Sequence, residues 1–153
     1  MTLMRERITE KAVSRLCIGG RIEGYQGRLP GLLEEPLLSL RAKKPLFLVG
    51  ALGGCTELAI DLLEQRSRPE MTTAVARKEV KHHDAVAALY AQHGGEFLTR
   101  EALAAELAAF GKGGLAAALN NGLDDTQNRE LFQSLNPIRI AELVLTGLRH
   151  LKI

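Results

Sequence analysis

Over the first 65 residues, the apolar positions follow two different patterns in turn. Short continuous apolar runs at 14–18 and 45–50 are typical of buried strands, and each run stops at a glycine. Residues 31–42, and the stretch from Gly53-Gly54 to about residue 65, place leucines on one face at helical spacing. Residues 4–13 read as the end of an amphipathic helix. The order strand, loop, helix, strand, loop, helix is the repeating unit of a parallel sheet covered by helices.

Beyond residue 67 the pattern is helical throughout. Ala- and Leu-rich helices are predicted at 81–93, 99–110 and 112–120, with Thr99 as an N-cap. Asp124 and Gln127 have the spacing of a capping box for a helix that ends near residue 134. Pro137 opens a last helix over 138–151.

The predicted sheet is too small to be complete. Both runs read as strands buried on both faces, and parallel sheets of two strands are not normally self-sufficient. Further strands therefore come from another chain, or the sequence is the C-terminal portion of a larger domain, which we favour. We expect an incomplete α/β, Rossmann-like parallel sheet flanked by helices over residues 1–66. Residues 67–153 would be a helical extension that packs on it and is not an independent domain.

Composition excludes several classes of protein. The 153 residues are 46% hydrophobic and 25% charged, the balance of a globular protein. There is no apolar run of membrane-spanning length and no secretory pattern at the start, and Cys17 and Cys55 are expected to stay reduced, so we expect a cytoplasmic location. A net charge of +2 and six aromatic residues argue against nucleic-acid binding.

Glycine and positive charge are concentrated in the first third of the chain. Eight of the fifteen glycines fall between Gly19 and Gly54, and residues 1–54 carry nine Lys and Arg against five Glu. The loop after the first strand holds the candidate ligand-binding residues Gly19, Gly20, Arg21, Gly24, Gly27, Arg28 and Gly31. Glycines let backbone amides approach a phosphate, and arginines bind its oxygens in a forked geometry. The alternative is a plain glycine-rich connection with solvated arginines.

The second strand is followed by a similar turn, which holds Gly50, Gly53 and Gly54. Because the carboxyl ends of parallel strands meet at one sheet edge, we expect the two turns to lie side by side and bind a ligand there. Close helix packing is the alternative for this turn. Glu34 and Glu35 either stabilise the start of their helix or face the ligand. His82-His83-Asp84 lacks a third ligand at usable spacing, so no metal is expected.

Two sets of motifs resemble a known family. Met4-x-x-Arg7, the Gly19-Gly20 pair, Gly31 and Glu35 resemble the LOG family of lysine decarboxylase-like proteins, although Ile8 replaces its lysine. The resemblance to a bacterial branch of the wider SLOG superfamily is closer. Three segments of this chain resemble that branch: G-G-R-I-E-G-Y-Q-G-R-L-P-G-L-L-E-E, the following P-L-F-L-V-G-A-L-G-G, and N-G-L-D-D-T-Q-N-R-E-L-F near the C-terminus.

The resemblance implies a Rossmann-like domain that binds nucleotides or nucleotide-derived signals such as NAD or ADP-ribose, with no cofactor. It also implies a sensor or regulatory role in bacterial anti-phage defence, with association into homo-oligomers or with a TIR-type effector chain. A LOG-type nucleoside-monophosphate phosphoribohydrolase, with Arg7 and Glu35 as catalytic residues, is the enzymatic alternative. Leu32 stands where the hydrolase motif has threonine, which favours binding over catalysis. The third alternative is a ligand-free fragment that pairs with a partner chain.

Overall fold

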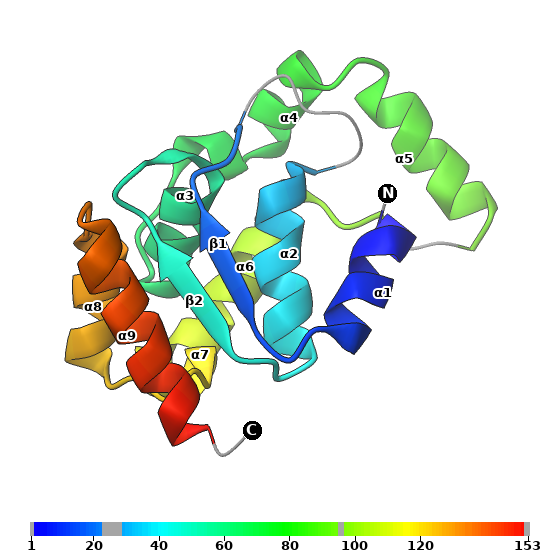
Figure 1. Ribbon diagram of the computed structural model, residues 1–153. Helices are drawn as coiled ribbons and strands as arrows, with labels where there is room; N and C mark the ends of the chain where they lie inside the picture. The colour runs from blue at the N-terminus through cyan, green and yellow to red at the C-terminus, as the bar shows by residue number, and fades with distance from the viewer. Residues whose placement is uncertain (1, 23–28, 95–96, 152–153) are drawn as a thin grey trace.

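Two short parallel strands form the centre of the molecule (Figure 1). The computed structural model describes residues 2–22, 29–94 and 97–151. Strands β1 (Arg15–Ile18) and β2 (Leu46–Val49) pair in parallel, with Leu16 opposite Phe47 and Ile18 opposite Val49. Helix α2 (Gly31–Arg41) connects the two strands, and α3 (Gly54–Leu63) follows β2. The predicted class, a small Rossmann-like α/β sheet that is incomplete and flanked by helices, is confirmed.

One face of the sheet is covered by a continuous apolar layer. Helices α2, α3 and α6 (Arg100–Gly111) lie behind the strands in Figure 1, and α7 (Leu115–Leu119) adds to the same layer. From the strands, the buried side chains of Cys17, Leu46 and Leu48 point into this core. The helices contribute mainly leucines at helical spacing, as the sequence pattern predicts.

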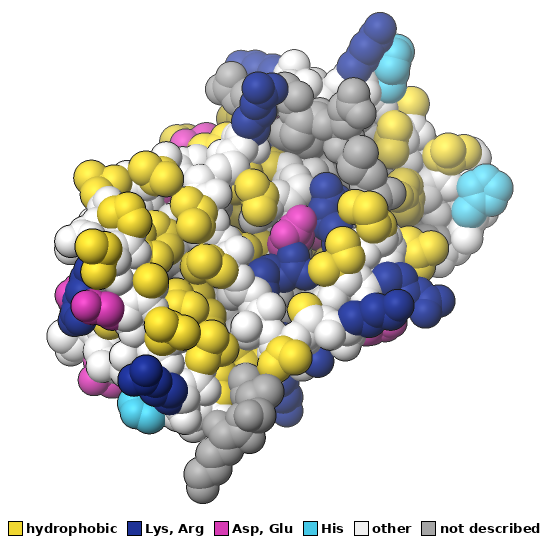
Figure 2. Space-filling view, in the orientation of Figure 1, with side chains coloured by type: hydrophobic (Ala, Val, Ile, Leu, Met, Phe, Trp, Pro, Cys, Tyr) yellow, Lys and Arg dark blue, Asp and Glu magenta, His cyan; other side chains and the backbone are white. Residues whose placement is uncertain are grey.

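The opposite face is covered only over β2. Helices α8 (Asp125–Gln133) and α9 (Pro137–His150) bury Phe47 and Val49 in a second apolar cluster. Leu16 and Ile18 of β1 lie on the same face, yet they are 45% and 42% exposed. Figure 2 shows hydrophobic side chains gathered over this side of the molecule. The expectation that both strands are buried on both faces therefore holds for β2 and is wrong for β1.

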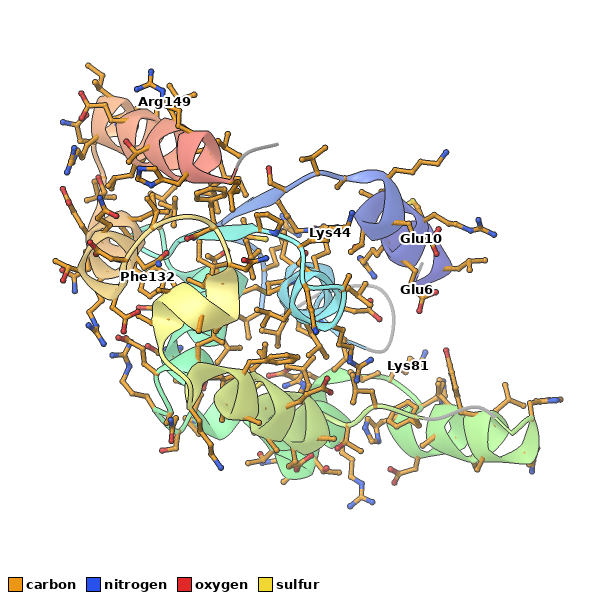
Figure 3. The ribbon with its side chains drawn as sticks, turned by 90° about the horizontal axis from the view of Figure 1, so that it is seen from below. Glu6, Glu10, Lys44, Lys81, Phe132 and Arg149 are labelled. Carbon is orange, nitrogen blue, oxygen red and sulfur yellow. The ribbon has the colours of Figure 1, made fainter. Side chains whose placement is uncertain are left out.

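The remaining helices lie around the edge of this core. Helix α1 (Thr2–Lys11) packs beside α2, at the end of the molecule away from α8 and α9 (Figure 3). The short helices η1 (Pro69–Met71) and α4 (Thr73–Glu79) follow α3, and α5 (His83–Gln92) extends from them. The sequence pattern did not predict η1 and α4, because neither is long enough to repeat an apolar position over two turns.

Two helices begin at the capping residues that the sequence predicts. The Thr99 hydroxyl accepts the Ala102 N–H at 3.1 Å, which confirms the predicted N-cap of α6. The Asp124 carboxylate accepts the Gln127 N–H at 2.8 Å and the Gln127 side chain accepts the Asp124 N–H at 3.0 Å, so the capping box is also confirmed. Within the described residues, every helix is too short or too polar to cross a lipid bilayer.

Candidate functional site

The two glycine-rich turns meet at the carboxyl ends of the strands. Gly19-Gly20 follow β1, and Gly53-Gly54 lead into α3. The N–H of Cys55 donates to the carbonyl of Gly20 at 3.0 Å, and the N–H of Thr56 donates to the carbonyl of Gly19 at 2.9 Å. The turns therefore lie side by side, as the strand order predicts.

This contact gives the second turn a structural role. The amides of Cys55 and Thr56 at the start of α3 are satisfied by the first turn, so they are not directed at a ligand. A Cβ atom on Gly54 would lie 2.1 Å from the Gly20 carbonyl oxygen, and a side chain there would force the turns apart. Ligand binding by Gly53 and Gly54 stays a prediction.

Positive charge gathers at the start of α2. The Pro30 carbonyl accepts the N–H groups of Leu33 and Glu34 at 2.9 and 3.2 Å, which places the helix N-terminus directly at Gly31. The Arg5 guanidinium lies against this glycine, because a Cβ there would be 2.2 Å from Arg5 Nη2. The positive end of the helix dipole and a guanidinium thus lie at the same place, where the carboxylates of Glu34 and Glu35 supply the negative charge.

Glu34 and Glu35 belong to a cluster of paired charges between α1, β1 and α2. Arg5 Nη1 lies 2.8 Å from a carboxylate oxygen of Glu34, which is 4% exposed, and Arg5 Nε lies 3.5 Å from Glu35. Arg15 pairs with the other oxygen of Glu35 and donates to the Thr9 hydroxyl at 2.8 Å. Both oxygens of Glu35 are thus engaged by arginines.

The structure separates Arg7 from this cluster. Its side chain is 71% exposed and lies 3.8 Å from Glu10 on the same helix. The guanidinium that meets Glu35 from α1 belongs to Arg5, two residues earlier. Arg5 and Arg7 lie about 200° apart around the helix, so only one of them can face α2.

The other predicted residues of the first loop fall into two groups. The side chain of Arg21 is exposed directly after the Gly19-Gly20 turn, and its carbonyl lies 2.8 Å from Cys55 Sγ. Gly24, Gly27 and Arg28 lie outside the described residues.

Comparison with known protein families gives a match over most of the chain. The model of one family, SLOG cluster2, matches residues 1–131. The chain belongs to the SLOG cluster2 family. The match also spans residues 67–119, which the motifs quoted above do not cover. No significant match was found among curated proteins, and none among solved structures.

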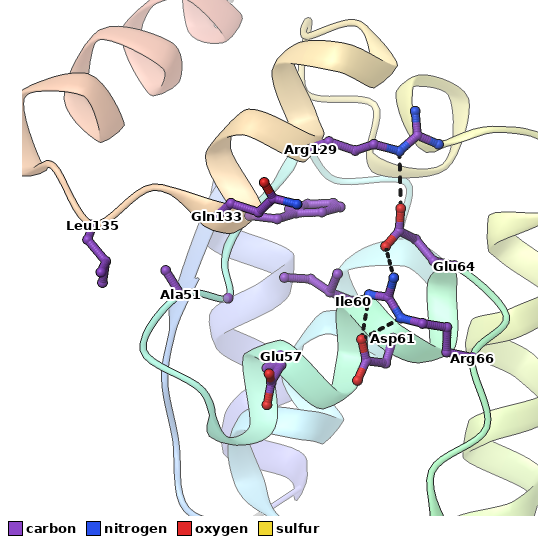
Figure 4. A pocket seen from close by; sticks show the side chains of 11 residues that line it. Ala51, Glu57, Ile60, Asp61, Glu64, Arg66, Arg129, Gln133 and Leu135 are labelled. Carbon is purple, nitrogen blue, oxygen red and sulfur yellow. Dashed lines mark hydrogen bonds and ion pairs between the residues drawn. The ribbon is translucent and has the colours of Figure 1, made fainter.

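Gly50 of this SLOG cluster2 chain lies on the other side of β2, toward α8. It lines a polar hollow of about 580 Å³ between α3 and α8 (Figure 4). Arg66 pairs with Asp61 at 2.5 Å and with Glu64 at 2.8 Å, and Glu64 also pairs with Arg129 at 3.1 Å. The hydrogen bond to Asp61 is the main reason that the pKa of Arg66 is raised. Asp61, Glu64, Arg66 and Arg129 therefore satisfy one another within this hollow.

Arg100 is a buried charge that the sequence reasoning missed. It is 3% exposed at the first position of α6, where it donates to the Glu70 carbonyl at 2.8 Å and to Glu79 at 2.5 Å. Its positive charge also acts on the Cys55 thiol, where it opposes the rise in pKa that burial causes. A cation is unfavourable at a helix N-terminus, and that conflict was the one available sequence signal.

The two cysteines are buried thiols and not reactive groups. Burial raises the pKa of Cys17 to about 12 and that of Cys55 to about 11. The described residues contain no cluster of three or more His, Cys, Asp or Glu side chains that could hold a metal ion.

Proposed function

We propose that this SLOG cluster2 chain binds a nucleotide or nucleotide-derived ligand, of the NAD or ADP-ribose type, at the carboxyl ends of β1 and β2. The observation that carries the proposal is the meeting of three features at one sheet edge. These are the Gly19-Gly20 turn, the N-terminus of α2, where Leu32 lies against Gly20, and the Gly53-Gly54 turn. Ligands of open α/β sheets bind at such an edge.

The chemistry of this edge suits a phosphate group. At the start of α2, the helix dipole adds partial positive charge at Gly31. The exposed Arg21 side chain follows the glycine turn and supplies a guanidinium that can bind two phosphate oxygens. Arg5 holds the helix start in place through Glu34 and Glu35.

The geometry favours binding over hydrolysis of the ligand. Catalysis of the LOG type, as the resemblance implies it, would need Glu35 and Arg7 to act on the same bond. Here Glu35 is engaged by Arg5 and Arg15, and Arg7 lies on the exposed side of α1. A sensor or regulatory module is therefore the proposed role. The further proposal of anti-phage defence with a TIR-type effector is supported by the family resemblance alone.

Titration calorimetry with AMP, ADP-ribose and NAD tests the proposal. For whichever of these ligands binds, Arg21→Ala is expected to weaken the binding free energy by about 1.5–3 kcal/mol, because a charge-assisted contact to phosphate is lost. Arg149→Ala is the matched control, since Arg149 lies at the far end of α9 (Figure 3) and is expected to leave the affinity unchanged. The proposal would be contradicted if the Arg21→Ala variant and the unmodified chain bound the ligand with equal affinity. It would also be contradicted if none of the three ligands bound.

A further inference from the structure

The first three residues after β1 direct their carbonyl groups at the start of α3. The Gly19 carbonyl accepts two hydrogen bonds from Thr56, one from its N–H and one from its hydroxyl, each at 2.9 Å. The Gly20 carbonyl accepts the N–H of Cys55 at 3.0 Å. The Arg21 carbonyl lies 2.8 Å from the Cys55 thiol. Two neighbouring residues of α3 thus bind three successive carbonyls of the loop.

Cys55 acts on the two peptide groups that flank the Cα atom of Arg21. The Gly20 carbonyl belongs to the peptide group before this atom, and the Arg21 carbonyl belongs to the peptide group after it. Because a peptide group is planar, a hydrogen bond to its carbonyl also fixes the direction of its N–H. With both flanking peptide groups held, the direction in which the Arg21 side chain leaves the backbone is fixed as well.

The Cys55 thiol is a hydrogen-bond donor in this contact. A carbonyl oxygen can only accept, so the S–H group donates to Arg21. The Cys55 side chain is 0% exposed, and burial raises the pKa of its thiol to about 11. The thiol therefore keeps its proton at neutral pH, and this proton is the one that the hydrogen bond requires.

Packing on both sides of Arg21 reinforces these hydrogen bonds. Gly20 is enclosed between α2 and α3, because a Cβ there would lie 2.6 Å from Leu32 Cδ1 and 3.1 Å from Cys55 Cβ. On the other side, the side chain of Ile22 packs against the apolar core. Arg21 itself is exposed between these two anchored residues. Its backbone is held from inside the molecule while its side chain faces solvent.

We propose that Cys55 is a positioning residue for Arg21: its N–H and thiol hold the loop so that the guanidinium is already directed at the ligand phosphate before binding. This inference rests on the proposed function, in which Arg21 binds the phosphate. A group that is held in its bound arrangement loses less conformational entropy when the ligand arrives. Thr56 holds Gly19 in the same way, two residues before Arg21.

The hold on Arg21 can be measured without a ligand. Nitrogen-15 relaxation gives the order parameters of the Arg21 and Ile22 amides in the unmodified chain, in Cys55→Ser and in Cys55→Ala. We expect about 0.85 for the first two, which keep a side-chain donor, and below about 0.6 for Cys55→Ala. Cys17→Ala is the matched control, because it removes the other buried thiol and is expected to leave both amides rigid.

Two results of this measurement would overturn the proposal. One is a flexible Arg21 amide in the unmodified chain, and the other is an equally rigid amide in Cys55→Ala. If Cys55→Ala does not fold, Cys55→Val gives the same test, because it fills the space without supplying a donor.

A double-mutant cycle of ligand affinity separates positioning from a purely structural role. For whichever of AMP, ADP-ribose and NAD binds, Cys55→Ala is expected to weaken binding by about 3- to 10-fold, and Cys55→Ser is expected to restore it to within about twofold. In the Arg21→Ala background, Cys55→Ala should have no further effect, because the side chain that it positions is absent.

Equal losses of affinity in both backgrounds would overturn the proposal, because Cys55 would then act on the fold and not through Arg21. Binding of none of the three ligands would contradict the proposed function. In that case the order parameters alone decide whether Cys55 holds Arg21, so failure of the proposed function and failure of this inference are told apart.

Discussion

The two strands are equally long and lie side by side, yet β2 is buried on both faces and β1 is buried on one. All four side chains of β2 are buried, whereas β1 buries only Cys17 completely. Leu16 and Phe47 are directly opposite each other in the sheet, and only Phe47 is covered. Burial of a parallel strand is therefore decided by the elements beyond it and not by its own sequence.

The outer edge of β2 shows what closes a strand edge without another strand. The side-chain amide of the fully buried Asn121 donates to the Leu46 carbonyl at 2.8 Å. The N–H of Gly50 donates to the Phe132 carbonyl, near the end of α8, at 2.9 Å. One side chain and one helix end thus replace a neighbouring strand for β2. No comparable group lies along β1 among the described residues.

The largest expected effect compares the opposite pair Phe47 and Leu16. Phe47→Ala is expected to lower the free energy of unfolding by about 3–5 kcal/mol, because it leaves a cavity in the cluster beneath α9. Leu16→Ala is expected to cost less than about 1 kcal/mol, because that side chain is already half exposed. Urea denaturation of both variants measures the difference. Equal losses would mean that β1 is covered as fully as β2.

Asn121→Ala tests the closed edge directly. It removes the donor to the Leu46 carbonyl and the acceptor of the Leu123 N–H, which lies 3.1 Å away. Leaving these groups unsatisfied is expected to cost about 2–3 kcal/mol. Gln133→Ala, at an exposed amide of α8, is the control and is expected to change stability by less than about 0.5 kcal/mol. Thermal unfolding distinguishes them, and a neutral Asn121→Ala would show that the edge is closed by something else.

The burial of Cys17 on the covered face of β1 can be tested through the pH dependence of stability. Burial raises the pKa of Cys17 from 9.0 to about 12, so the unfolded chain loses this proton at lower pH than the folded chain. The free energy of unfolding should therefore fall as the pH rises from 9 toward 12, with this thiol contributing about 1.4 kcal/mol per pH unit. Cys17→Ala is expected to reduce that slope. An identical slope in both proteins would mean that Cys17 is accessible to water.

The sequence was sufficient for the local architecture. Apolar runs ending at glycine marked both strands, and the spacing of Thr99, Asp124 and Gln127 marked two helix starts. These signals are local, because a strand, a cap or a helical stripe depends on residues a few positions apart.

Features that depend on tertiary neighbours could not be predicted in this way. An apolar run does not distinguish the enclosed β2 from the open β1. The match of Met4-x-x-Arg7 to a motif drew attention to Arg7, whereas helix geometry turns Arg5 toward Glu35. The roles of Asn121 and Arg100 also depend on segments more than 20 residues away.

Residue-resolved amide exchange of the chain alone tests the contrast between the two strands most directly. If β1 is open and β2 closed, the Leu16 and Ile18 amides should exchange at nearly the rate of an unstructured peptide. The amides of Cys17, Phe47 and Val49, which face the β1–β2 ladder, should be protected by several orders of magnitude. Equal protection of all five amides would contradict the account, because the outer edge of β1 would then already be paired.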